Sequence, residues 1–151
     1  MDSGAPHKII LLVEDNPDDA ELIRRAFERN KVTDRIVIAQ DGVEALEYLF
    51  DPSSQLPHLV LLDLKLPRLS GLEVLARIRA NPRTRLQPVV LFTSSTEESD
   101  RISGYDLGAN SYVRKPIDFN QLVDAAQKLV SYWLRINEPP PDRMTVSEVA
   151  R

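Results

Sequence analysis

A run of four apolar residues that ends in a carboxylate is the feature that most constrains the fold. Leu59–Leu62 is wholly apolar, Asp63 follows it directly, and Pro67 and Gly71 come shortly afterwards. A short apolar run bounded in this way is typical of a strand buried on both faces, as in a parallel sheet. In an open sheet of that kind, ligands bind beyond the carboxyl ends of the strands. Asp63 is therefore a candidate for a functional residue.

The same pattern predicts four more strands, and a helical pattern follows each of the five. The predicted strands are residues 9–13, 36–39, 59–62, 88–92 and 111–114. Between and after them, apolar residues recur at the spacing of amphipathic helices. The residues that we expect to cap four of these helices are Asn16, Ser70, Ser95 (with Glu98 as a capping box) and Asp118. Gly104 weakens the fourth helix, which we expect to be the most mobile element.

This alternation predicts the fold class. Five strands alternating with five helices indicate an α/β protein with a doubly wound parallel sheet. We expect the flavodoxin-like (βα)5 arrangement with strand order 2-1-3-4-5, whose switch point lies between the first and third strands. The residues that follow those two strands would then meet in one crevice.

Length and terminal composition predict one domain. A chain of 151 residues can bury a stable core, and we assign the domain to residues 8–135. Residues 1–7 are interpreted as a flexible N-terminus. Residues 136–151 begin with a proline-rich segment, continue with polar residues and are interpreted as a flexible tail. That tail is too short for a DNA-binding or enzyme module, so we expect a stand-alone domain.

The overall composition excludes several classes of protein. The formal net charge is −4, which gives no support to general nucleic-acid binding. The chain has no cysteine, which excludes disulfides and thiolate metal sites. No apolar run approaches a membrane-spanning length, and residues 1–8 lack the apolar core of a signal peptide. We therefore expect a cytoplasmic protein that binds neither nucleic acid nor membrane.

Carboxylates follow both strands at the predicted switch point. Glu14 and Asp15 come after the first strand, and Asp63 comes after the third. Three carboxylates in one pocket repel each other unless a cation joins them, and oxygen ligands of this kind suit Mg²⁺. The metal would neutralise charge on an incoming phosphoryl group and align it with Asp63. We hypothesise that Asp63 is the nucleophile that accepts this group.

Two further side chains lie where an acyl phosphate would need partners. Thr93 comes directly after the fourth predicted strand and would supply a hydroxyl, and Lys115 follows the fifth and would supply an ammonium group. Each residue alone has an ordinary explanation, because threonine is common in turns and a single lysine is usually exposed. The combination favours a site, since complementary groups follow four of the five strands.

Four segments resemble the receiver domain of bacterial two-component response regulators. They are residues 10–17, 59–71, 89–95 and 108–116, and the resemblance extends from about Lys8 to Arg135. It implies the following roles: Asp63 as the phosphorylated aspartate, Glu14 and Asp15 as the acidic Mg²⁺ pair, the Lys65 backbone carbonyl as a further metal ligand, Thr93 as the switch hydroxyl, Lys115 as the conserved lysine, Tyr112 as the aromatic switch and a cis Lys115–Pro116 bond.

Within that family, the chain is most similar to the single-domain regulators paired with bacterial phytochromes. The segments that carry this likeness are residues 13–19, 63–67 and 88–95, together with the extended C-terminus. It implies a sensor histidine kinase as the partner, which for this subgroup is a bacteriophytochrome, whereas related regulators serve other sensor kinases. It also implies a signalling protein without enzymatic activity beyond self-phosphorylation from a donor and slow autodephosphorylation.

We also expect a homodimer through the face made by the fourth helix, the fifth strand and the fifth helix, which is the family's usual output face. The fifth helix has more apolar length than a small sheet requires, with Trp133 and Leu134 beyond its central turns. The alternative is a monomer whose terminal apolar turn folds back on its own core. Arg101, Tyr105 and Arg114 lie on the other elements of this face, and interfaces are enriched in such residues.

Three alternatives share parts of this pattern. A flavodoxin-like flavin protein would need a phosphate-cradling loop after the first strand, where Glu14 and Asp15 would instead repel a phosphate. A haloacid-dehalogenase-type phosphatase would carry a second acid two residues after the nucleophile, where this chain has Lys65. A pseudo-receiver that acts only through protein contacts would not need Asp63, Thr93 and Lys115, although their presence does not exclude it.

Overall fold

Five parallel strands pair in the order β2-β1-β3-β4-β5 in the computed structural model, which describes residues 8–30 and 35–141. The strands are β1 (Ile9–Val13), β2 (Arg35–Ala39), β3 (Leu59–Leu62), β4 (Val89–Thr93) and β5 (Ser111–Arg114). The helices are α1 (Pro17–Arg29), α2 (Gly42–Phe50), α3 (Gly71–Ala80), α4 (Glu98–Asp106) and α5 (Phe119–Val130), followed by the π-helical turn η1 (Ser131–Ile136). The predicted fold class and strand order are confirmed.

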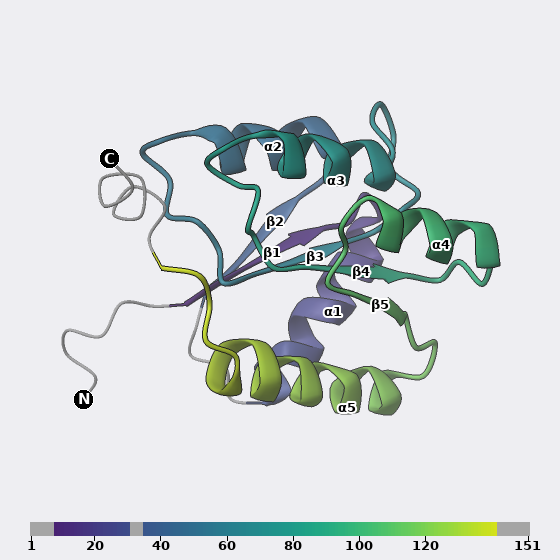
Figure 1. Cartoon of the computed structure of the whole chain (residues 1–151). Helices are drawn as coiled ribbons and strands as arrows, with labels where there is room; N and C mark the ends of the chain where they lie inside the picture. The colour runs from purple at the N-terminus through teal and green to yellow at the C-terminus, as the bar shows by residue number, and fades with distance from the viewer. Residues whose placement is uncertain (1–7, 31–34, 142–151) are drawn as a thin grey trace, which may run out of the picture.

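The helices form two layers, one on each face of the sheet. Figure 1 shows α1 and α5 below the sheet and α2, α3 and α4 above it. Successive residues of a strand point to opposite faces, so Ile10 and Leu12 pack toward α1 and α5, and Leu11 and Val13 pack toward α2 and α3. β1, β3 and β4 are buried at every position because both of their faces are covered.

Capping residues explain where most helices begin. The side chain of Asn16 accepts hydrogen bonds from the amides of Asp18 and Asp19 at the start of α1, and Ser70 and Glu73 form a capping box on α3. Asp118 accepts from the amide of Gln121 in α5. These three predicted caps are confirmed.

The predicted capping box of Ser95 on α4 is wrong. The N-cap of α4 is Glu97, and it makes no side-chain capping bond. The Ser95 hydroxyl instead donates to Asp100 Oδ2 over 2.6 Å. Because the N-cap of α4 lies two residues after Ser95, Ser95 stands outside the cap position.

Gly104 has a packing role that the sequence pattern did not reveal. It is the only buried residue of α4, and an added Cβ would collide with the Leu91 side chain on β4. The glycine lets α4 approach the sheet closely. Our expectation that it makes α4 the most mobile element remains a prediction.

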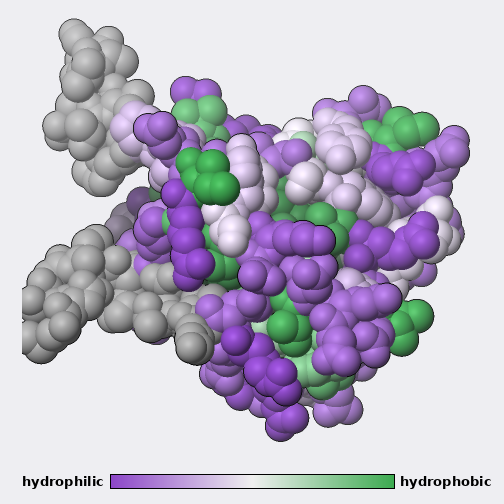
Figure 2. All heavy atoms as spheres, turned by 90° about the horizontal axis from the view of Figure 1, so that it is seen from below, coloured by the Kyte–Doolittle hydropathy of each residue, from purple (hydrophilic) through white to green (hydrophobic). Residues whose placement is uncertain are grey.

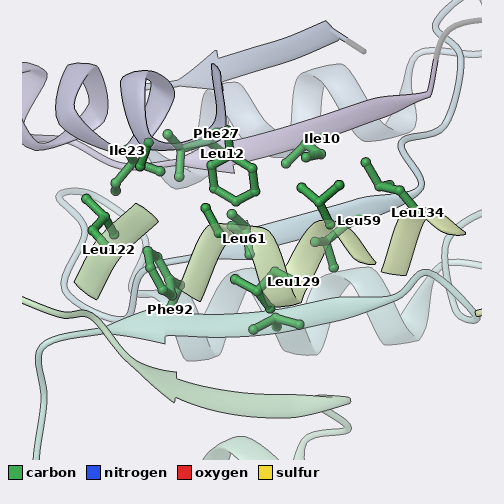
Figure 3. Packing of buried hydrophobic residues seen from close by; sticks show 14 of the residues in the cluster. Ile10, Leu12, Ile23, Phe27, Leu59, Leu61, Phe92, Leu122, Leu129 and Leu134 are labelled. Carbon is green, nitrogen blue, oxygen red and sulfur yellow. The ribbon is translucent and has the colours of Figure 1, made fainter. Parts of the chain in front are cut away.

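The apolar end of the fifth helix lies partly in the core rather than free for a partner. Leu134 in η1 is only 2% exposed and belongs to the cluster that contains Ile10 and Leu59 (Figure 3). Trp133 is partly buried against the same cluster. Our assignment of Leu134 to surplus apolar length was therefore wrong, because η1 continues α5 far enough for Leu134 to cover β1 and β3.

The outer face of the α1 and α5 layer is mainly hydrophilic. In Figure 2, hydrophobic residues on this face form separate patches among hydrophilic ones. Among the residues that the structure describes, no helix is long and apolar enough to cross a membrane. The proposed N-terminal segment 1–7, and residues 142–151 of the proposed tail, lie outside the described residues.

Candidate functional site at the carboxyl ends of the strands

The pairing of β1 with β3 brings the two acidic segments together. Val13 and Leu62 are register partners at the ends of these strands, so Glu14 and Asp63 follow them at the same edge of the sheet. The amide of Asp63 donates to the Val13 carbonyl (3.2 Å), and the amide of Glu14 donates to the Ala39 carbonyl on β2 (3.0 Å). Backbone hydrogen bonds therefore fix both acidic residues at the switch point.

Three carboxylates converge there. Glu14, Asp15 and Asp63 can each offer one oxygen such that these atoms lie within 4.8 Å of one another. Glu14 and Asp63 are buried, whereas Asp15 is exposed. The donor set contains only carboxylate oxygens and is open on the side of Asp15. These residues therefore fit a hard divalent cation, which takes oxygen ligands and keeps some of its waters.

Lys115 joins the cluster from the end of β5. Its Nζ lies 2.5 Å from Glu14 Oε1 and 3.1 Å from Asp63 Oδ2, and its amide donates to the Thr93 carbonyl over 2.8 Å. Burial alone would lower the pKa of Lys115, but its hydrogen bond to Glu14 and the charges of both carboxylates together raise it. The ammonium group is therefore charged at neutral pH and balances part of the negative charge.

In this cluster, burial shifts the pKa of Glu14. Burial raises its pKa, and the hydrogen bonds from Lys115 and from the Asn16 amide offset only part of that rise. The charge of Asp63 acts in the same direction as burial. An additional cation near Glu14 would favour its ionised form.

Thr93 and Tyr112 are linked through the loop between β4 and α4. Thr93 is buried at 1% exposure, and its Oγ1 accepts a hydrogen bond from the Ser95 amide (3.3 Å). The hydroxyl of Tyr112 on β5 donates to the Ser95 carbonyl (3.1 Å). Both predicted residues therefore contact Ser95, whose connecting position the sequence analysis did not identify.

The loop after β3 holds Asp63 in place. The Lys65 amide donates to Asp63 Oδ1 (3.3 Å), and the Gly71 amide donates to the Leu64 carbonyl (2.8 Å). A Cβ on Gly71 would collide with the Asp63 carbonyl and would lie 2.7 Å from Leu64 Cα. Only glycine allows the start of α3 to return this close, and sequence reasoning recorded Gly71 without that role.

The expected cis Lys115–Pro116 bond is not observed. The described part of the chain contains no cis peptide bond. The trans form of an X–Pro bond is intrinsically favoured by about 0.5–1 kcal/mol. Lys115 reaches both carboxylates from the trans backbone, so the described contacts do not require the cis form.

The response regulator receiver domain family matches residues 10–127, a span that includes all of these residues. The chain belongs to this family. Membership excludes the flavin-binding and haloacid-dehalogenase alternatives, which belong to other families.

Two curated relatives are similar to this receiver over most of their lengths. The probable methanogenesis regulatory protein FilR2 of Methanothrix harundinacea is 45% identical over 135 residues, which cover 87% of each chain. Response regulator Rcp1 of Synechocystis sp. is 37% identical over 137 residues, which cover 88% of this chain and 93% of Rcp1.

Solved structures agree with the fold and with a divalent ion. The Mn²⁺-bound form of Rcp1 has a TM-score of 0.80 at 36% identity, and the phosphorylated cyanobacterial phytochrome response regulator RcpA has a TM-score of 0.82 at 38% identity. These comparisons cover 88% and 89% of this chain and 99% of each relative. The bacteriophytochrome response regulator AtBRR is 44% identical with a TM-score of 0.70, over 89% of this chain and all of AtBRR.

Proposed function

We propose that this receiver accepts a phosphoryl group on Asp63 from a sensor histidine kinase. The observation that carries the proposal is the pairing of Lys115 Nζ with Asp63 Oδ2 beside two further carboxylates at the switch point. One oxygen of Asp63 would attack phosphorus, the bond from phosphorus to the kinase histidine would break, and the imidazole would take the electron pair. The product is an acyl phosphate on Asp63.

Each neighbouring residue has a proposed role in this transfer. The carboxylates of Glu14, Asp15 and Asp63 and the backbone carbonyl of Lys65 would hold Mg²⁺, which when bound supplies positive charge for the phosphoryl oxygens. Lys115 would keep its ammonium group beside Asp63 and contact the phosphoryl oxygens. The Thr93 hydroxyl would donate to one of these oxygens and thereby report that the group is present.

We propose that this signal reaches the face formed by α4, β5 and α5 through Thr93 and Tyr112. A pocket of about 320 Å³ opens on this face beside Tyr112 and is also lined by Arg101 and Arg114. In the part of the chain that the structure describes, neither guanidinium group has an ion-pair partner. Ile102 and Tyr105 on α4 are 58% and 50% exposed. Unpaired arginines beside exposed apolar side chains support a role in protein contacts.

The proposed partners are a second copy of this chain at that face and a dimeric sensor kinase in the cytoplasm. Similarity to AtBRR and RcpA supports a bacteriophytochrome as the kinase. Similarity to FilR2, at a comparable identity, supports a sensor of another kind. Phosphotransfer from a purified bacteriophytochrome, measured against transfer from an unrelated kinase, separates these two sources.

Intact-mass measurement after incubation with Mg²⁺ and a small phosphodonor tests the central proposal. Wild-type protein should gain a single phosphoryl adduct, and chelation of Mg²⁺ should abolish it. Asp63→Asn should gain none, whereas Asp41→Asn, which changes an aspartate after β2, should behave as wild type. An undiminished adduct on Asp63→Asn would reject the assignment of the acceptor. No adduct on wild-type protein would favour a pseudo-receiver that acts through contacts alone.

A further inference from the structure

Ser95 connects two of the residues that the proposed function uses. It lies in the loop between β4 and α4, two residues after Thr93, and is 7% exposed. Its amide donates to Thr93 Oγ1 (3.3 Å), and its carbonyl accepts from the Tyr112 hydroxyl (3.1 Å). The backbone of Ser95 therefore touches the end of β4 on one side and β5 on the other.

The side chain of Ser95 adds a third connection, to α4. Its hydroxyl donates to Asp100 Oδ2 (2.6 Å) and accepts from the Glu97 amide (3.3 Å). Asp100 lies in the first turn of α4. A short hydrogen bond from a hydroxyl to a carboxylate is of the charge-assisted kind, which is stronger than a bond between neutral groups.

Few other contacts fix the start of α4. Its N-cap residue, Glu97, makes no side-chain capping bond, and Gly104 is the helix's only buried residue. Glycine contributes no side chain to the packing, so α4 has no buried apolar side chain, whereas each of α1, α2, α3 and α5 has at least three. The position of its first turn therefore depends strongly on the bond between Ser95 and Asp100.

We propose that Ser95 and Asp100 form a latch that makes the position of α4 depend on the Thr93 hydroxyl. This inference rests on the proposed function, because it takes Thr93 to respond to a phosphoryl group on Asp63. Ser95 and Asp100 act as positioning residues, since neither is assigned a contact with the phosphoryl group.

The hydrogen bonds give the latch a direction. Thr93 Oγ1 is the acceptor in its bond with Ser95, so its own proton can be donated to a phosphoryl oxygen. If the hydroxyl moves toward that oxygen, the buried Ser95 amide either loses its acceptor or follows it. A buried N–H without an acceptor is unfavourable, so the loop follows. Asp100 is then drawn with the loop, and the first turn of α4 shifts.

The latch makes a prediction that a purely backbone connection does not. If the Ser95 carbonyl and amide alone carried the signal from Thr93 to Tyr112, the Ser95 hydroxyl would not matter for α4. If the latch operates, removal of the hydroxyl disconnects α4 from the site while Asp63 still accepts the phosphoryl group.

Hydrogen–deuterium exchange of the full chain tests the latch. Deuterium uptake in residues 94–107 is measured with and without Mg²⁺ plus beryllofluoride, a phosphoryl mimic, and the small-phosphodonor adduct is checked by intact mass. In wild-type protein the mimic should change exchange in the first turn of α4. Ser95→Ala and Asp100→Ala should keep the adduct but lose this change.

Matched variants separate the latch from general damage. Ser94→Ala changes the exposed neighbour of Ser95, and Asp106→Ala changes an acidic residue at the other end of α4, so both should respond as wild type. Ser95→Thr keeps a hydroxyl and should retain the response. A wild-type-sized response in Ser95→Ala overturns the latch but leaves the proposed function intact. A wild-type protein that gains no adduct overturns both.

Discussion

At the scale of single residues, the site depends on one ammonium group held between two buried carboxylates. Lys115 contacts both Glu14 and Asp63 and is itself largely buried. A buried ion pair is costly to form, and removal of one partner leaves the other without compensation. Lys115 therefore stabilises the metal-free site and would also meet an incoming phosphoryl group.

The contribution of Lys115 to stability should depend on pH. Its pKa is raised above the ordinary 10.5 by the two carboxylates, which outweigh burial, so folding favours the protonated form. This contribution is fully present below pH 10.5 and is lost as the pH rises through the folded pKa. We expect Lys115→Met to lower the free energy of unfolding by roughly 1–3 kcal/mol at neutral pH.

Urea unfolding in a chelator, from neutral pH to above pH 10.5, measures this effect. The stability difference between wild type and Lys115→Met should shrink across the upper part of that range. Lys128→Met removes an exposed lysine from a surface pair and is the control. A difference that stays constant with pH would contradict the assigned ion pair.

Asp15 should govern the response to Mg²⁺. It is the exposed member of the carboxylate cluster, and Asp15→Asn removes a charge that repels its neighbours when no metal is bound. We expect the melting temperature of the metal-free variant to rise and the Mg²⁺-induced shift to fall. Asp18→Asn, in the exposed first turn of α1, serves as the control. An unchanged Mg²⁺ shift in Asp15→Asn would mean that the metal binds elsewhere.

At the scale of elements, helix ends and short loops decide how the site is held. The N-terminal cap of α1 begins immediately after Glu14 and Asp15, and the return at Gly71 starts α3 directly beside Asp63. α4 differs from these helices because it has neither a side-chain cap nor an apolar buried face. The sheet and its flanking helices thus form a fixed support, and α4 is the element with the least to hold it.

The π-helical turn after α5 should contribute to core stability. Leu134 is 2% exposed, whereas Ile136, two residues later in the same turn, is 67% exposed. Removal of a buried leucine side chain typically costs about 2–5 kcal/mol. We expect Leu134→Ala to fall in that range and Ile136→Ala to change stability little, as measured by urea unfolding. Equal effects of the two substitutions would contradict the packing of η1 on the core.

At the scale of the whole molecule, the parallel topology assembles a site from residues that are far apart in sequence. Glu14 and Lys115 are about a hundred positions apart, yet their side chains meet because both residues follow the carboxyl ends of parallel strands, which lie at the same edge of the sheet. The same topology leaves β5 at an edge, where its partly buried residues lie between α4 and α5. The site at the strand ends and the edge strand β5 are therefore close enough for one loop, residues 94–97, to contact both.

The proposed dimer belongs to this scale. A two-fold interface uses the same surface of both partners, so a single substitution reverses the charge on both sides of the interface. We expect wild-type protein to sediment as a dimer at micromolar concentration and Arg101→Glu to shift it toward monomer. Arg85→Glu changes an exposed arginine in the loop between α3 and β4 and is the control. A wild-type protein that remains monomeric with and without phosphorylation would remove the dimer.

The sequence by itself determined the strands, their order and most of the site. Runs such as Ile9–Val13 and Leu59–Leu62 are apolar at every position, and only a strand covered on both faces suits that pattern in so few residues. Because parallel strands end at one edge, the residues after each run were predictable as neighbours. Position after a strand was enough to predict that Asp63, Glu14 and Lys115 lie together.

Only the tertiary structure decided how these elements approach one another. In the sequence, Gly104 indicates a weak point in a helix, but in the structure it lets α4 pack closely against Leu91. Leu134 reads as surplus apolar length, but β1 and β3 place it in the core. The sequence pattern predicts Ser95 as a helix cap, but α4 has its N-cap two residues later, at Glu97, and the Ser95 hydroxyl donates to Asp100. In each case a local pattern had several possible partners, and long-range packing selected one of them.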